Sequence, residues 1–264
     1  MAKLQGLLFG LATLLLVALA TFFFTKTWLP TLVSDRGAID QAIMVSLVVT
    51  GVVFIATNLT LGWFAWRYQD SPNAVRSYWH ENGRLEWTWT AITAGIMLIF
   101  TFRALSLWAQ VTAPAPADSF VVEVTGQQFA WNVRYPGKDG IFGRTDVKFV
   151  DPSSGNFIGL DKADPTAADD ILMQNQLVLP LGRPVRVRLR SIDVIHSFFL
   201  PNFRVKQDAV PGMTSETWFI PRAAGTWEIA CAEHCGLGHY RMRGQVDVVP
   251  PGDVDARIKQ AIEQ

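Results

Sequence analysis

The chain has few reactive and few charged side chains for its 264 residues. It contains two cysteines and four histidines, and charged residues make up 17% of it. Lysine and arginine together number 23, as do aspartate and glutamate, so no excess of positive charge points to nucleic acid. No Cys-x-x-Cys-His sequence occurs, which excludes a c-type haem attached to this chain. The length allows one domain of ordinary size in addition to membrane segments.

Charge is absent from three long stretches, residues 4–25, 41–66 and 87–102. An apolar helix needs about 20 residues to cross a bilayer. The second stretch meets this length. The third meets it by continuing past Arg103 to about Trp108, with the arginine head extended to the interface. We therefore predict a transmembrane helical hairpin within residues 26–110.

The first uncharged stretch has two interpretations. Lys3, the apolar run Leu7–Val17 and the small residues Ala18–Ala20 match a signal peptide with a cleavage site. The same residues also suit a retained first membrane helix. Residues 1–25 are thus predicted to be either a signal peptide or a first transmembrane helix.

Positive charges near the membrane segments indicate their orientation. Arg67, Arg76 and Arg84 lie between the second and third stretches, which predicts that this loop is cytoplasmic. Everything after Trp108 then lies on the outer side of the membrane.

The sequence after Trp108 is typical of a β-domain. Residues 111–119 form a linker rich in proline and alanine, and residues 136–170, rich in Gly, Asp, Pro and Ser, suggest a long surface excursion. Apolar runs bounded by turn residues predict strands at 120–125, 176–179, 184–190, 217–220, 225–230 and 244–249. The pattern predicts a β-sandwich or barrel over residues 120–250. Residues 251–264 form a short amphipathic helix or a frayed tail.

The strongest chemical signal lies within residues 231–242. Both cysteines, Cys231 and Cys235, are here with His239 and Met242. Thiolate, imidazole and thioether form a soft ligand set that favours copper. The alternatives are a disulfide in an oxidising compartment and a zinc site. Neither alternative needs the methionine. The candidate for a second histidine ligand is His196, which follows the strand predicted at 184–190.

Several segments resemble one family, cytochrome c oxidase subunit 2. The resemblance is carried by residues 193–212 around His196, by residues 231–242, by the Gly-x-Gln aromatic segment at 126–131, and by residues 85–90. It covers about residues 40–250. It implies a membrane-anchored all-β protein, in which transmembrane helices precede a cupredoxin-like Greek-key β-sandwich.

The resemblance also implies a binuclear copper centre of the CuA type. Cys231 and Cys235 would bridge two copper ions, and His196 and His239 would each bind one of them. Met242 and the backbone carbonyl of Glu233 would complete the ligand set. The side chain of Glu233 would reach a magnesium ion shared with the catalytic subunit, and a carboxylate suits that ion.

Partners follow from the same resemblance. The chain would be subunit 2 of an oxidase similar to the aa3 type, in the cell inner (plasma) membrane. It would pass electrons from cytochrome c to haem in subunit 1, which also holds CuB and reduces oxygen to water with proton pumping. Glu86 would lie at the mouth of a proton pathway, or be a helix N-terminal acid. Lys206 and Asp208 would face haem propionates, or form a surface salt bridge.

The sequence departs from the family pattern where electrons would enter. The family often has Trp-Tyr-Trp after Gly-x-Gln, and this chain has Phe129-Ala130-Trp131. Phenylalanine is harder to oxidise than tryptophan, so we expect electrons to enter by another route or to tunnel past Phe129. Two further functions stay open, a CuA subunit of a nitric oxide reductase and a copper-less quinol oxidase subunit. A membrane-anchored copper carrier is a third, and Glu86, Lys206, Asp208 and Glu233 argue against it because they suit a partner.

Overall fold

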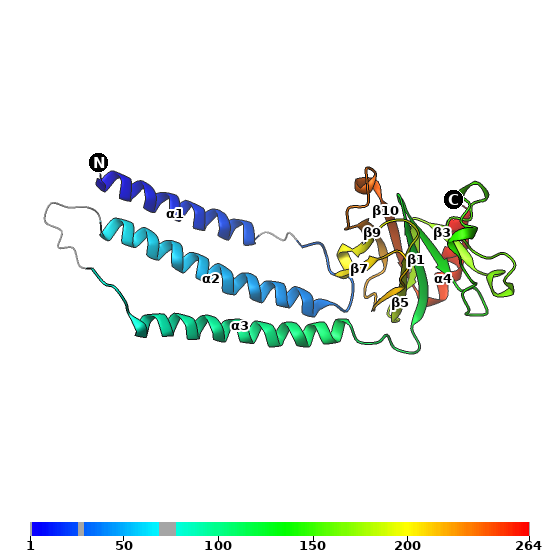
Figure 1. The fold of residues 1–264 in the computed structure, drawn as a ribbon, viewed down its shortest axis with the longest axis horizontal. Coiled ribbons are helices and arrows are strands. Elements are labelled where there is room, and N and C mark those ends of the chain that lie inside the picture. The colour runs from blue at the N-terminus through cyan, green and yellow to red at the C-terminus, as the bar shows by residue number, and fades with distance from the viewer. Residues whose placement is uncertain (1, 26–28, 69–77, 264) are drawn as a thin grey trace. The chain divides into compact units, whose positions relative to one another are not determined.

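A computed structural model describes residues 2–25, 29–68 and 78–263 of the chain (Figure 1). The chain divides into two compact units. One comprises residues 1–29 and 38–110, and the other comprises residues 30–37 and 111–264.

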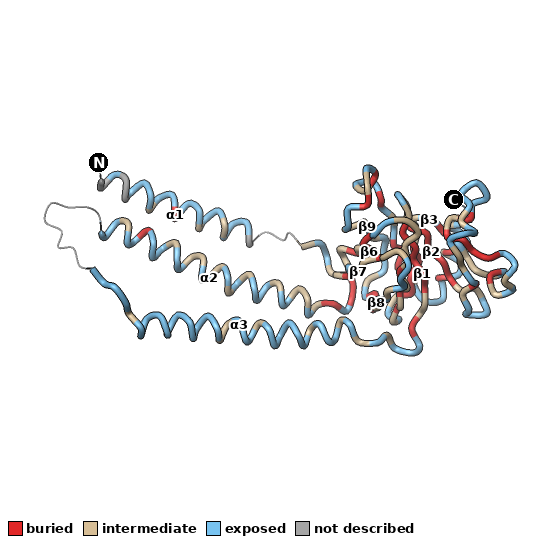
Figure 2. Tube along the Cα trace, in the orientation of Figure 1, coloured by how far each residue is buried: buried red, intermediate tan, exposed pale blue. Residues whose placement is uncertain are grey.

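The first unit consists of three apolar helices, α1 (Ala2–Thr25), α2 (Gly37–Arg67) and α3 (Gly83–Val111). By length and composition, α2 and α3 are able to cross a membrane, and α1 contains a shorter apolar segment, Leu7–Phe23. Large apolar side chains are exposed along all three helices (Figure 2), as expected of helices that face lipid. The predicted transmembrane segments are therefore present as helices. Arg76, used above to orient the loop, lies outside the described residues.

Helices α1 and α2 approach closely at one point. A Cβ added to Gly62 of α2 would lie 3.0 Å from Thr13 Oγ1 of α1. Thr13 is buried, and its hydroxyl donates to the carbonyl of Gly10 at 2.8 Å. Small residues permit such close packing between membrane helices.

The second unit is a β-sandwich of two five-stranded sheets. In the first sheet the strand order is β3-β2-β1-β5-β8, and in the second it is β4-β10-β9-β6-β7. The strands of the first sheet are β1 (Phe120–Gln127), β2 (Ala130–Tyr135), β3 (Ile171–Gln174), β5 (Val185–Ser191) and β8 (Ser215–Phe219). Those of the second are β4 (Gln176–Pro180), β6 (His196–Leu200), β7 (Val205–Ala209), β9 (Gly225–Cys231) and β10 (Arg243–Val249).

This architecture confirms the predicted membrane-anchored β-sandwich. The sheets are mixed, because β1 pairs in parallel with β5 and β4 pairs in parallel with β10. Strands β2, β3, β6 and β7 were not predicted from the sequence. They are four to six residues long and lack the clean alternation that identifies β5.

Alternation along β5 shows how the sequence builds the sandwich. Val185, Val187 and Leu189 are fully buried between the sheets, while the arginines between them point to the outer face. Phe198 on β6 and Trp131 on β2 are also fully buried in this core. The two sheets are therefore held together mainly by apolar burial, which contributes about 25 cal/mol per Å².

Residues 136–170 form an ordered excursion rather than an irregular loop. It contains three short 3-10 helices, each capped by an aspartate side chain, Asp146, Asp151 or Asp164. Ile158 and Leu160 form a small apolar cluster of its own. The guanidinium of Arg134 on β2 donates to the Gly143 carbonyl at 2.7 Å and ties the excursion to the first sheet.

A segment far from the β-domain in sequence packs into it. This strap, residues 30–37, places Val33 in the sandwich core, where it is 1% exposed. The backbone N–H of Val33 donates to the Asn202 carbonyl at 2.8 Å, and its carbonyl accepts from the Arg222 N–H at 2.7 Å. The guanidinium of Arg36 lies over the Trp218 ring at 5.2 Å. These contacts were not predicted from the sequence.

The chain closes with helix α4 (Val254–Ile262). Val254 and Ile258 are buried on its inner side, and Arg257 pairs with Asp247 of β10 at 2.7 Å. Of the two alternatives for residues 251–264, the structure shows the helix.

Candidate metal centre

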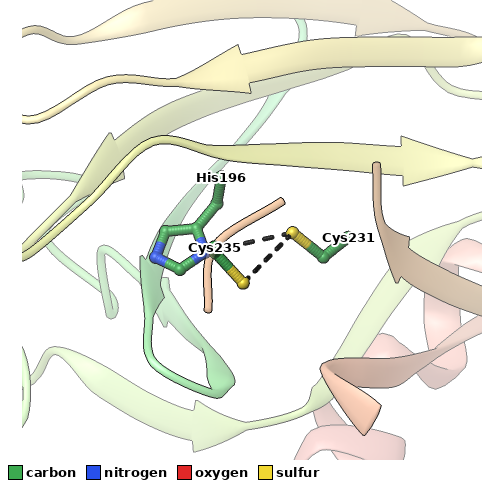
Figure 3. A group of neighbouring side chains, drawn as sticks. All are labelled: His196, Cys231 and Cys235. Carbon is green, nitrogen blue, oxygen red and sulfur yellow. Dashed lines mark hydrogen bonds between the residues drawn. The ribbon is translucent and has the colours of Figure 1, made fainter. Parts of the chain in front are cut away.

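Two neighbouring strands of the second sheet bring the ligand candidates together. His196 is the first residue of β6 and Cys231 is the last of β9, and these strands pair antiparallel with Phe198 opposite Cys231. Cys235 follows in the loop between β9 and β10. Figure 3 shows the two thiols and the imidazole pointing toward one another. Their ligand atoms all lie within 4.8 Å of one another.

Each thiol also has its own set of neighbours. Cys231 Sγ lies 3.9 Å from His196 Nδ1 and 3.2 Å from the carbonyl oxygen of Glu233. Cys235 Sγ lies 3.7 Å from His239 Nδ1 and 3.8 Å from Met242 Sδ. The two sulfur atoms are 3.9 Å apart. The six predicted ligands therefore surround the pair of sulfur atoms, with a histidine nitrogen beside each sulfur.

The two cysteines are free. A disulfide requires an S–S distance of about 2.05 Å, which is far shorter than the observed separation. Cys235 and Met242 are buried, His196 is fully buried, and His239 is half-buried. The cluster is therefore shielded on the side of the sandwich core and reaches solvent mainly through the loop.

The two thiols differ in acidity. Burial opposes ionisation of Cys231, but its hydrogen bonds with His196 and the Ser197 backbone outweigh this and lower its pKa. Burial raises the pKa of Cys235, and the negative charge of a Cys231 thiolate raises it further. Cys231 therefore ionises first. A metal held by both sulfurs would require Cys235 to be ionised too.

The chemistry of these donors fits copper better than the alternatives. Two thiolates, two imidazole nitrogens and a thioether form a soft set, and Met242 is fully buried with its sulfur directed at Cys235. Zinc sites use no thioether. A disulfide between the two cysteines would give no role to the two imidazoles, the thioether or the backbone carbonyl that lie beside the sulfur atoms.

Asp193 holds His196 in place, a role that sequence reasoning missed. One carboxylate oxygen lies 2.8 Å from His196 Nε2, so Nδ1 is the nitrogen left for a metal. The other accepts from the Gln128 N–H at 2.7 Å. Metal-binding histidines commonly use such a carboxylate to fix ring orientation. The sequence contains a signal for this role, because an acidic residue three positions before a candidate ligand histidine can reach the imidazole ring.

The first sheet packs against the candidate ligands from the side opposite the second sheet. A Cβ on Gly126 of β1 would lie 2.8 Å from His196 Cδ2, so only glycine leaves room for the imidazole. The Gln128 side chain donates to the Cys235 carbonyl. Trp131 meets the His196 ring edge-to-face, with ring centroids 6.0 Å apart. The turn between β1 and β2 thus supports both His196 and the Cys235 loop.

The two aromatic residues proposed for electron entry differ in exposure. Trp131 is fully buried in the core, so a docked donor does not touch it. Phe129 is half-buried and packs on the loop, where a Cβ on Gly238 would lie 2.4 Å from its ring. The guanidinium of Arg241 lies 5.8 Å from the centroid of the Phe129 ring. Of the two, only Phe129 lies between the loop and solvent.

Three further predicted residues are not among the six candidate ligands. Lys206 and Asp208 on β7 form an ion pair at 3.1 Å, and both side chains are about half exposed. Hydrogen bonding by Ser197, and then by Lys206, lowers the pKa of Asp208 despite partial burial. Glu86 lies in the first turn of α3 and accepts from the Asn82 N–H at 3.3 Å. A surface salt bridge and a helix N-terminal acid are thus present in the structure, and neither contact removes the partner-facing roles implied by the resemblance.

Fold and site together define a class: a membrane-anchored β-sandwich protein with a soft-ligand metal site at one end of the sandwich. Residues 120–249 match the family model described as cytochrome c oxidase subunit II, periplasmic domain. The chain belongs to the cytochrome c oxidase subunit 2 family, whose members are subunits of an oxidoreductase. Its apolar helices and the match to a periplasmic domain indicate a membrane-anchored protein with a periplasmic C-terminal domain.

Two relatives and one solved structure illustrate the similarity. "Alternative cytochrome c oxidase subunit 2" of Bradyrhizobium diazoefficiens is 38% identical over 94% of this chain and 90% of that protein. Cytochrome c oxidase subunit 2 of Cereibacter sphaeroides is 31% identical over 81% of this chain and 73% of that protein. The crystal structure of the periplasmic domain of subunit II of cytochrome oxidase of Bradyrhizobium japonicum is 29% identical, with a TM-score of 0.41. The match covers 57% of this chain and 98% of the chain in that crystal structure.

Proposed function

We propose that this chain is the electron-accepting subunit of a haem-copper oxygen reductase similar to the aa3 type. It holds a binuclear CuA centre and passes electrons from a cytochrome c or similar donor to haem in subunit 1. Subunit 1 would hold that haem and CuB, reduce oxygen to water and pump protons. The chain would lie in the inner membrane as a multi-pass protein with its β-domain outside.

The pairing of donors around the two thiols carries this proposal. Cys231 Sγ has His196 Nδ1 and the Glu233 carbonyl as neighbours, and Cys235 Sγ has His239 Nδ1 and Met242 Sδ. A single metal would use four of these donors. Two metals bridged by both sulfurs would use all six. The arrangement therefore supports a pair of copper ions, which when bound supplies one-electron transfer with the charge shared over both metals.

The protein's contribution is to keep the ligands still. His196 and Cys231 lie on paired strands, and Asp193 and Gly126 fix the imidazole from two sides. The Cys231 N–H donates to the Met242 carbonyl at 3.2 Å, which joins the two ends of the loop. Ligands held in this way move little when the charge of the site changes, which favours fast electron transfer.

The loop also offers a contact for a partner subunit. The Glu233 side chain is exposed while its carbonyl faces Cys231, so the carboxylate is available to a magnesium ion shared with subunit 1. Lys206 and Asp208 are exposed enough to face haem propionates. Glu86 would gather protons at the cytoplasmic end of α3, a role compatible with its place in the first helical turn.

Electrons would reach the loop past Phe129. Its ring packs on the Gly238 backbone between Cys235 and His239, so the distance left to tunnel is short. The nearby Arg241 guanidinium makes removal of an electron from the ring less favourable. We therefore propose tunnelling past the ring rather than its transient oxidation.

The test is spectroscopic, on the full chain purified in detergent and loaded with copper. Metal analysis is expected to give two coppers per chain, and electron paramagnetic resonance one unpaired electron shared by both. Cys235→Ser is expected to abolish the shared signal while circular dichroism stays unchanged. One copper per chain, or a shared signal that survives Cys235→Ser, would contradict the proposal.

Two methionines provide a matched control. Met242→Leu removes the buried thioether beside Cys235 and is expected to shift the spectrum of the copper-loaded chain. Met213→Leu makes the same change at a side chain that is 62% exposed and outside the cluster. It is expected to leave the spectrum as it is. Equal spectra for both variants would remove Met242 from the ligand set.

A further inference from the structure

A polar pocket of about 280 Å³ lies on the outer face of the first sheet, beneath the excursion. Arg134, Arg188 and Arg190 line it from the strands, and Arg144 lines it from the excursion. Glu123 is the one carboxylate among its lining residues, all of which the structure describes. None of these residues belongs to the candidate metal centre. We call this feature the arginine pocket.

The floor of the arginine pocket is a row of alternating charges. Arg134, Glu123, Arg188 and Glu216 are successive register partners across β2, β1, β5 and β8. Arg134 is 3% exposed and is satisfied twice, by Glu123 at 2.6 Å and by Asp170 at 3.0 Å. Its charge is therefore balanced within the protein. Like-charged neighbours on a sheet would repel, so the alternation keeps these side chains extended over the strands.

The positive charge of Arg188 is not balanced by carboxylates in this way. Its nearest carboxylate among the described residues is Glu216, at 4.0 Å from its Nε. Glu216 already accepts three hydrogen bonds from Arg186, at 2.7 to 2.9 Å. Arg190 is 3.6 Å from Glu123, whose carboxylate is shared with Arg134. The pocket thus presents guanidinium groups that its own carboxylates do not fully satisfy.

An aromatic side chain and two hydroxyls complete the walls. The Phe142 ring lies 4.8 Å from the guanidinium of Arg134 and 5.4 Å from that of Arg188, which holds both against the sheet. Thr145 accepts from Arg190, and Thr214 lines the opposite edge. Donors of this kind suit a small oxyanion, because a guanidinium binds two oxygens of a phosphate at once. The volume is below the roughly 300–1,000 Å³ typical of drug-sized ligands.

We propose that the arginine pocket binds a small oxyanion of the phosphate class, held mainly by Arg188 and Arg190. Binding there would add the missing negative charge between the sheet and the excursion, and would hold the excursion in place. The proposal is independent of the copper assignment, because no residue is shared between the two sites.

The test is a calorimetric titration of the full chain in detergent with inorganic phosphate, at constant ionic strength set with chloride. Saturable binding is expected, with acetate binding more weakly because it carries one charge. Arg188→Gln keeps a polar side chain but removes the guanidinium, and is expected to weaken phosphate binding about tenfold or more. An unchanged affinity in Arg188→Gln, or no saturable heat above that of chloride, would overturn the proposal.

Arg243→Gln is the matched control. Arg243 lies on β10 of the second sheet, pairs with Glu228 at 3.2 Å and lies outside the pocket lining. It is expected to leave phosphate binding unchanged; equal losses in both variants would show that surface charge alone attracts the anion. Titrations in nanodiscs of neutral and of anionic phospholipid separate two sources of phosphate. Equal affinities assign the pocket to a free anion, and loss in the anionic discs assigns it to a lipid headgroup.

Discussion

The two sheets of the sandwich contribute different parts of the candidate metal centre. The second sheet provides the candidate ligands: His196 begins β6, Cys231 ends β9, and the loop from β9 to β10 carries the other four. The first sheet provides no ligand. Instead, Gly126 on β1 and Gln128 and Phe129 in the turn between β1 and β2 pack on the candidate ligands and their loop.

The two sheets thus contribute two kinds of residue. Those of the second sheet are candidates to bind the metal, and those of the first sheet restrict the positions of the ligand side chains. A ligand is defined by its donor atom, so its loss should remove the metal. A supporting residue is defined by shape and hydrogen bonding, so its change should alter affinity and spectrum while the metal still binds. Variants on the first sheet test this distinction most directly.

Gly126→Ala is expected to have the largest effect. The new Cβ would lie 2.8 Å from His196 Cδ2 and 3.0 Å from Cγ, so the imidazole or the β1 backbone has to move. Overpacking of this kind costs about 1–3 kcal/mol of folding free energy. We expect a lower thermal midpoint and a changed spectrum of the copper-loaded chain, both measured on the full chain in detergent.

Gly252→Ala is the control for this variant. Gly252 lies in the same unit, and no heavy atom would come within 4 Å of its new Cβ. Its midpoint and spectrum should match those of the unaltered chain. If Gly126→Ala also left both unchanged, the first sheet would not restrict the imidazole as the comparison claims.

Asp193→Asn is expected to act on metal affinity more than on folding. The variant loses the negative charge beside His196 Nε2, and its amide cannot accept from both His196 and Gln128 as the carboxylate does. Loss of such a partner typically lowers metal affinity about 10- to 100-fold. Competition with a chelator measures the change. Asp255→Asn on the exposed surface of α4 is the control, and equal affinities in the two variants would remove Asp193 from its supporting role.

The candidate ligands were far easier to find in the sequence than the residues that pack against them. Cys231, Cys235, His239 and Met242 lie within twelve residues, and their donor atoms alone suggested a soft metal. His196 lies 35 residues earlier; it was a candidate because it follows the strand predicted at 184–190, and the family resemblance then implied it as a ligand. Gly126 has no such signal, because a glycine says nothing about which distant side chain will pack against it.

The fold shows the same limit. Strand β5 was predicted from its alternating valines and arginines, since one buried face imposes a period of two. Strand β6 was not, because His196, Ser197 and Phe198 are buried in succession and no period results. The excursion was predicted as a surface segment. Its attachment to the first sheet through Arg134 was not predicted, because it depends on a contact with Gly143 across the turn that ends β2.

The strap was the least predictable feature, and Val33→Ala tests whether it belongs to the sandwich. Val33 is 1% exposed in the core and lies 87 residues before Phe120, where β1 begins. Removing two methyl groups there is expected to cost about 1–2 kcal/mol. The thermal midpoint should fall while the copper spectrum stays the same, because the backbone hydrogen bonds of Val33 run to Asn202 and Arg222, which are not candidate ligands.

Val147→Ala makes the same change in the excursion, where the side chain is 66% exposed, and should leave the midpoint unchanged. A fragment that begins at Asp118 lacks the strap and should melt below the full-length β-domain. If Val33→Ala behaved like Val147→Ala, the core would be complete without the strap, and the two sheets alone would account for the stability of the site. A lower midpoint with an intact copper spectrum would instead separate the residues that hold the sandwich together from those that shape the metal centre.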